Sequence, residues 1–126
     1  MRTFRLAMAQ INPTVGDLEG NTDAILRFIR KAQTCGADLV VFPEMSLSGY
    51  PPEDLLFNPQ FIQDGLRCLQ HIVAETQGIT AVIGYVDAHC GHLHNSAAVA
   101  SDGKLVGNYN KIFLPNFGVF DEKRYF

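Results

Sequence analysis

The sequence predicts an α/β fold with a mixed, largely parallel sheet, and three observations lead to this prediction. The first half alternates strand-like and helix-like segments in the order strand, helix, strand, helix, strand, which is typical of right-handed βαβ units. The run Leu39–Phe42 is continuously apolar, as in strands buried on both faces. Ser101-Asp102-Gly103 then separates two strand-like runs, and Asp-Gly at such a position favours an antiparallel hairpin.

The first three elements are predicted within residues 4–42. Residues 4–11 are mostly apolar and are followed by Asn12-Pro13, so they are predicted to form the first strand. The first helix is predicted to begin at Asn21, as its N-cap, and to end at Gly36. The second strand is predicted at residues 38–42. The apolar residues of this helix recur at helical spacing and are Ala24, Ile25, Phe28, Ile29 and Ala32.

The rest of the chain is predicted to hold one helix, three strands and an irregular tail. The helix ends before Gly78, and the strands are predicted at residues 79–86, 93–100 and 104–109. Residues 110–126 are aromatic and irregular, and such a segment normally packs against something. We therefore expect the chain to be cut from a longer one. The apolar residues that define the second helix are Phe61, Ile62, Leu66, Leu69, Ile72 and Val73.

The composition favours one soluble globular domain over residues 1–126, with no second domain. Of the 126 residues, 47% are hydrophobic and 18% are charged. The formal net charge is -3 and no long run of Lys or Arg occurs, which argues against nucleic-acid and anionic membrane partners. No apolar segment has the length of a membrane span or of a signal-peptide core. We therefore expect a cytoplasmic location.

The three cysteines are Cys35, Cys68 and Cys90, and none forms a C-x-x-C pair. Neither a disulfide framework nor a cysteine zinc site is therefore predicted, and reduced thiols are expected. Cys35 lies at a predicted helix end and Cys68 on an apolar helical stripe. Both are predicted to pack as small buried hydrophobes.

A cluster of metal-ligating residue types is formed by His89, Cys90, His92 and His94. Imidazole and thiolate ligands suit Zn or Ni. A closed metal site, however, usually needs four well-placed ligands, and the sequence offers no distant second pair. Residues 87–92 are instead predicted to form an exposed hairpin connection. We therefore predict no metal site.

Two charged residues directly follow predicted strands. Glu44 follows the strand at residues 38–42, and Lys111 follows the strand at residues 104–109. Ligand crevices of α/β sheets lie at the carboxyl ends of strands, so both charges are expected at one edge of the sheet. In a partly dry crevice they would form either a structural ion pair or an acid/base pair. Spacing along the chain leaves both interpretations open.

Three stretches carry a resemblance to a known family: LAMAQINPTVGDLEGN, LVVFPEMSLSGYPPEDLL and GNYNKIFLPNFGVFDEKRYF. Through them the chain resembles the nitrilase (carbon-nitrogen hydrolase) superfamily over essentially its whole length. Within that superfamily it is most similar to the N-terminal glutaminase domain of glutamine-dependent NAD synthetases, because of SGYPPEDLL and FDEKRYF. The resemblance implies that the fold is part of an αββα sandwich.

The resemblance also implies roles for individual residues. The family uses a Glu, Lys, Cys triad, in which Glu44 would be the general base and Lys111 would stabilise the oxyanion. Glu122 would support the lysine and help to place the substrate, and Tyr50 would line the glutamine pocket. The alternatives are a solvated carboxylate for Glu122 and an aromatic anchor of the Pro-rich loop for Tyr50. The nucleophilic cysteine is expected beyond residue 126, so we expect this chain to be inactive alone.

The reaction implied by the resemblance is hydrolysis of glutamine to glutamate and ammonia, without a cofactor. The ammonia would pass to a synthetase domain that uses ATP and Mg to amidate deamido-NAD, and no phosphate-binding G-x-x-x-x-G-K loop for such a domain occurs here. Homo-oligomers are expected from the family. Two alternatives remain: a stand-alone amidase acting on another carboxamide, and a non-catalytic fragment or interaction module.

Overall fold

The computed structural model describes residue 1 and residues 3–126, and this part of the chain contains one five-stranded sheet. The strand order is sequential, β1-β2-β3-β4-β5. β1 pairs with β2 and β2 with β3 in parallel, whereas β3, β4 and β5 pair antiparallel. The predicted α/β fold with a mixed sheet is therefore confirmed. The strands are β1 (Leu6–Met8), β2 (Leu39–Val41), β3 (Thr80–His89), β4 (His92–Ser101) and β5 (Lys104–Asn110).

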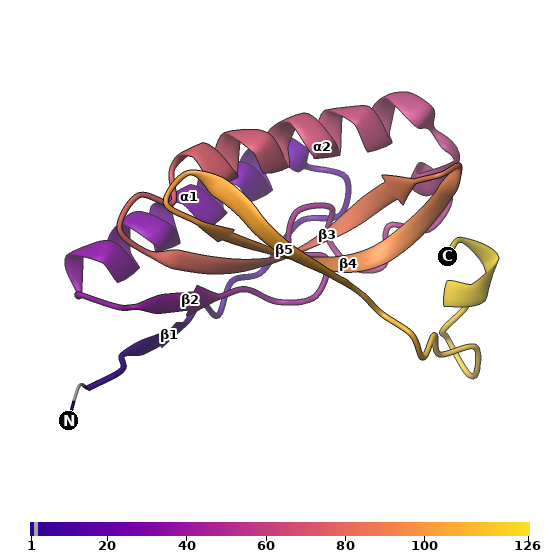
Figure 1. The fold of residues 1–126 in the computed structure, drawn as a ribbon. Helices are drawn as coiled ribbons and strands as arrows, with labels where there is room; N and C mark the ends of the chain where they lie inside the picture. Colours follow the sequence, from indigo (N-terminus) through magenta and orange to yellow (C-terminus); the bar gives the residue numbers. More distant parts are fainter. Residues whose placement is uncertain (2) are drawn as a thin grey trace.

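Two helices, α1 (Leu18–Thr34) and α2 (Pro59–Ala74), cover one face of the sheet (Figure 1). Successive right-handed crossovers that advance in one direction along a sheet place their helices on the same side. Ile25 and Ile29 of α1 and Ile72 of α2 are fully buried against this face. The main hydrophobic core therefore lies between the helices and the sheet. None of the described helices has the length and apolar character that crossing a membrane requires.

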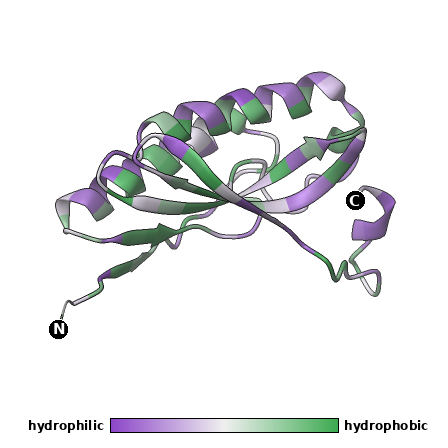
Figure 2. Cartoon of the chain, viewed as in Figure 1, coloured by the Kyte–Doolittle hydropathy of each residue, from purple (hydrophilic) through white to green (hydrophobic). Residues whose placement is uncertain are grey.

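The opposite face of the sheet carries exposed apolar side chains. Leu6 and Met8 of β1 and Tyr109 of β5 are exposed, whereas Ala7, between Leu6 and Met8, packs against the core under the helices. Figure 2 shows continuous apolar colouring along β1 and β2, where alternating polar residues would mark a solvated face. The fold therefore consists of one helical layer and one sheet layer, with an apolar sheet surface on the far side.

The first helix begins earlier than the sequence predicts. Its N-cap is Asp17, whose side chain accepts from the backbone N–H of Gly20 at 2.9 Å. The prediction of Asn21 as the cap is wrong, because Asn21 lies inside the helix and is buried. Its side chain instead bonds both backbone groups of Thr14, each at 2.8 Å, and the carbonyl of Leu47 at 3.0 Å. Asn21 therefore links the loop before the helix to the loop that follows β2.

Other boundaries differ by a few residues. β1 spans three residues instead of residues 4–11, because β2, its partner, is itself only three residues long. α2 ends at Ala74, and Gly78 lies in the following turn with φ +71°. The predicted exposed connection at residues 87–92 is wrong in extent. β3 continues to His89, and Cys90-Gly91, both at positive φ, form a two-residue turn into β4.

Candidate active site

The predicted position of Glu44 at the carboxyl end of β2 is confirmed. After Val41 the chain turns and lies against β3, with Phe42 N–H donating to the Val82 carbonyl at 2.9 Å and Leu47 N–H to the Gly84 carbonyl at 3.1 Å. A Cβ at Gly84 would lie only 2.3 Å from the Pro43 carbonyl oxygen. Glycine at position 84 therefore allows the segment that carries Glu44 to approach β3.

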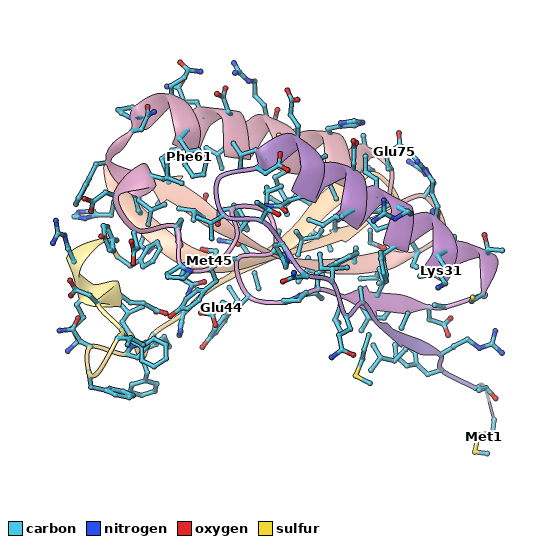
Figure 3. The ribbon with its side chains drawn as sticks, turned by 180° about the vertical axis from the view of Figure 1, so that it is seen from behind. Met1, Lys31, Glu44, Met45, Phe61 and Glu75 are labelled. Atoms are coloured by element: carbon cyan, nitrogen blue, oxygen red, sulfur yellow. The ribbon has the colours of Figure 1, made fainter. Side chains whose placement is uncertain are left out.

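Lys111 lies one residue after β5 and reaches Glu44. Its Nζ lies 2.8 Å from Oε1 of Glu44, and its backbone N–H donates to the Asn95 carbonyl at 2.8 Å. β4 and β5 reverse direction twice after β3, so β5 ends at the same edge of the sheet as β2 and β3. This topology brings together two residues that are 67 positions apart in the sequence. Figure 3 shows Glu44 projecting toward the yellow C-terminal segment.

Glu122 lies on the other side of Lys111, at the start of the short 3-10 helix η2 (Glu122–Arg124). Its side chain is buried, and Lys111 Nζ lies 3.1 Å from its Oε2 and 3.2 Å from its Oε1. The Tyr50 hydroxyl donates to Oε1 at 2.9 Å. Oε2 has no well-aligned hydrogen bond, so the charge of Lys111 is its main compensation. The alternative of a solvated carboxylate is therefore wrong.

The site contains more negative than positive charge, because one lysine, Lys111, lies between the two carboxylates of Glu44 and Glu122. Burial alone would lower the pKa of Lys111, but the hydrogen bonds and charges of Glu44 and Glu122 together raise it above its ordinary value. Lys111 is therefore held in its cationic form at neutral pH. Burial, the hydrogen bond to Glu122 and the charges of Glu122 and Glu44 raise the pKa of Tyr50 to about 12.

A contact between two distant segments, residues 50–57 and 122–126, holds Glu122 in this position. The Tyr125 hydroxyl donates to Asp54 Oδ1 at 2.8 Å, and Arg124 lies 3.6 Å from the same oxygen. The rings of Tyr125 and Phe57 are 5.2 Å apart between centroids. A cavity of about 490 Å³ lies between the two segments and is bordered by Tyr50 and Glu122. The stretches SGYPPEDLL and FDEKRYF thus contact each other.

Asn95 on β4 is a site residue that the sequence reasoning missed. It is 4% exposed, and its side-chain Nδ2 donates a short hydrogen bond to Oε1 of Glu44. Its signal in the sequence is weak: a single amide before a run of small apolar residues in a predicted strand. A buried amide needs partners, so its position in a buried strand is the feature that could have indicated a polar neighbour.

Glu44, Asn95 and Lys111 border a second cavity of about 270 Å³ on the face of the sheet opposite the helices. The other lining residues are mostly small or apolar, and no cysteine occurs among the described residues of this lining. They are Phe42, Pro43, Val82, Gly84, Ser96, Ala97 and Tyr109. A carboxylate, a cation and an amide thus meet beside a space that is large enough for a small carboxamide.

The cysteines and histidines lie away from this cavity. Cys35 is exposed at the end of α1, so its predicted burial is wrong, because it caps the helix and does not face the sheet. Cys68 packs partly against the core, as predicted. His89 and His92 are opposite each other across the turn that contains Cys90. Among the residues that the structure describes, no group of three or more His, Cys, Asp or Glu is arranged for a metal ion.

Tyr50→Phe is expected to reduce the stability that the protein loses when the pH becomes alkaline. A tyrosine pKa raised from 10.0 to about 12 in the folded state stabilises the fold fully below pH 10, and this contribution is lost as the pH rises to about 12. The variant lacks this group, so its free energy of unfolding should fall less between these pH values. Denaturant unfolding at several pH values measures the difference. An identical pH dependence for both proteins would contradict a raised pKa for Tyr50.

The residues of this site lie in a region that matches a known protein family. A family model described as carbon-nitrogen hydrolase matches residues 5–126, and thus nearly the whole chain. The chain belongs to the carbon-nitrogen hydrolase family. The resemblance seen in the sequence is therefore confirmed, and Glu44, Lys111 and Glu122 all lie within the matched region.

The similar members of the carbon-nitrogen hydrolase family include glutamine-dependent NAD(+) synthetases. The protein of Thermotoga maritima is 45% identical over all of this chain, which spans 22% of that protein. The protein of Xanthomonas campestris is 45% identical over 98% of the chain, which spans 23% of its length. The chain thus corresponds to less than a quarter of each relative.

Solved structures agree with this assignment. The glutamine-dependent NAD+ synthetase of Acinetobacter baumannii, determined with ADP, matches all of this chain and 24% of its own, with a TM-score of 0.94 and 42% identity. An amidase from Nesterenkonia sp. matches 98% of the chain and 47% of its own, with a TM-score of 0.81 and 23% identity. The second likeness shows that the carbon-nitrogen hydrolase fold is shared.

Proposed function

We propose that residues 1–126 are the N-terminal part of a glutaminase domain that supplies ammonia to an NAD synthetase. The observation that carries this proposal is the contact of Lys111 with both Glu44 and Glu122 beside a small cavity. A structural ion pair needs one carboxylate, whereas this lysine has two, and the partner Glu44 is half exposed, with 47% of its side chain accessible. The similarity to glutamine-dependent NAD(+) synthetases supports glutamine as the substrate.

The proposed chemistry needs a thiol nucleophile, and we propose that a cysteine outside residues 1–126 supplies it. Glu44 takes the thiol proton as the sulfur attacks the amide carbon, and Lys111 Nζ stabilises the oxyanion that forms. The C–N bond then breaks, Glu44 returns the proton to the departing nitrogen, and ammonia leaves a thioester. Water, deprotonated by Glu44, attacks the thioester and releases glutamate and the thiol.

The two supporting residues act on the geometry of this pair. Glu122, which accepts a hydrogen bond from the Tyr50 hydroxyl, also contacts Lys111 and so helps to keep its ammonium group beside Glu44. We assign Glu122 and Tyr50 as positioning residues, and both border the cavity of about 490 Å³ between residues 50–57 and 122–126. The glutaminase reaction proposed here uses no cofactor. In this proposal ATP and Mg are used by the synthetase domain of the complete protein. We propose that the complete protein is a cytoplasmic homo-oligomer.

A substrate panel tests this function. The complete protein that contains this chain should release ammonia from glutamine at least about tenfold more efficiently, in kcat/KM, than from asparagine or simple aliphatic amides. Coupled ammonia detection measures each rate. A preference for another carboxamide would support the stand-alone amidase instead. Release from none of the amides would overturn the proposal and support a non-catalytic module.

A further inference from the structure

We propose that Asn95 is a positioning residue that fixes the Glu44 carboxylate so that Oε2 is the oxygen that accepts and returns the proton. This inference rests on the proposed function of Glu44 and Lys111. It assigns a role to a residue that carries no charge and does not titrate.

Asn95 lies on an interior strand of the sheet. β4 is paired on both sides, and Asn95 is opposite Val86 of β3. Its carbonyl accepts from the backbone N–H of Lys111 at 2.8 Å, and the residue is 4% exposed. Asn95 therefore has little freedom to move relative to the sheet, and its backbone also sets the position of Lys111.

The contacts of Glu44 are unequal between its two oxygens. Asn95 Nδ2 and Lys111 Nζ both donate to Oε1. Among the described residues, no hydrogen bond reaches Oε2. Two donors on one oxygen leave the other oxygen as the free acceptor. Oε1 therefore stays on its fixed partners, and Oε2 is left to exchange the proton.

Asn95 supplies what Lys111 alone does not. Lys111 has a long, flexible side chain that is 30% exposed, and Glu44 itself is 47% exposed, so a contact between these two alone would be mobile. The Asn95 amide is buried and rigid, and it cannot lose its proton to the carboxylate at neutral pH. It therefore holds Glu44 without competing with the substrate for proton transfer.

Replacement of Asn95 should lower kcat with little change in KM. Asn95→Leu keeps the approximate volume but removes the donor, and a misplaced general base costs about 10²-fold in rate. The complete protein is assayed for ammonia release from glutamine. Asn108→Leu is the matched control, because Asn108 lies on β5 and bonds Tyr85, Asp87 and Asn110. Its kcat should stay within about twofold of wild type.

Asn95→Asp gives a second readout that a purely structural role would not produce. It keeps the shape of the side chain but places a second carboxylate against Glu44, and each disfavours the ionisation of the other. The acidic limb of the kcat/KM profile should therefore move to higher pH by about one unit or more. This variant also serves if Asn95→Leu does not fold.

The outcomes separate this inference from the proposed function. If Glu44→Gln is inactive while both Asn95 variants keep the wild-type kcat and pH profile, the role of Asn95 is overturned and the proposed function stands. If Glu44→Gln is fully active, the proposed function fails and the role of Asn95 fails with it. A loss in kcat together with the shifted pH profile supports the assignment.

Discussion

Glu44→Gln is expected to lower kcat for the proposed glutamine hydrolysis by about 10³-fold in the complete protein, with KM changed by less than about threefold. Glutamine at position 44 retains an acceptor oxygen for Lys111 and Asn95 but cannot act as the general base that we propose for Glu44. The loss therefore falls on the chemical step and not on substrate binding. Steady-state measurement of ammonia release gives both constants.

Glu75→Gln is the matched control for this prediction. Glu75 is a half-exposed carboxylate after α2, 4.0 Å from Arg30, and Figure 3 shows it far from Glu44, on the helical side of the molecule. The control should retain wild-type kcat. A Glu44→Gln variant as active as this control would mean that Glu44 and Lys111 form only a structural ion pair.

Lys111→Met is expected to destabilise the folded protein by about 2 kcal/mol. Glu122 is 5% exposed and Lys111 is its main charge partner, so the variant leaves a buried carboxylate with only the Tyr50 hydroxyl. Breaking a buried pair costs about 3 to 5 kcal/mol, and the partial exposure of Lys111 reduces this value. Denaturant unfolding measures the change.

The double variant Lys111→Met/Glu122→Gln should recover most of the lost stability, because the buried group is then neutral. Lys104→Met, an exposed lysine at the start of β5, is the control and should change the free energy of unfolding by less than about 0.5 kcal/mol. Equal destabilisation by the single and double variants would show that the charge of Glu122 is compensated in another way.

The sequence was sufficient to predict the Glu44–Lys111 contact, because strand order and strand ends decide it. An apolar run fixes β2, and Asp102-Gly103 fixes the β4–β5 hairpin. Two reversals after β3 then return the chain to the same edge of the sheet. These are short-range signals with strong physical causes. The location of both charges at one edge follows from them without any knowledge of side-chain packing.

The sequence was not sufficient for residues whose role depends on long-range packing. The burial of Glu122 depends on contacts between residues 122–126 and 50–57, which no periodicity indicates, and the neighbouring Lys123 and Arg124 favour an exposed site. Asn95 was missed because a lone amide gives no charge or spacing signal. The cap at Asp17 was missed because the predicted apolar stripe begins at Ala24, about two turns after Asp17.

The most direct test of the account is a double-variant cycle in kcat/KM for glutamine with Glu44→Gln, Lys111→Met and both changes together. Residues that act as a unit in one chemical step lose most of the activity when either is removed. We predict that kcat/KM of the double variant lies within about threefold of that of the less active single variant. Losses that multiply, or single variants that retain wild-type activity, would contradict a joint role for Glu44 and Lys111 in amide hydrolysis.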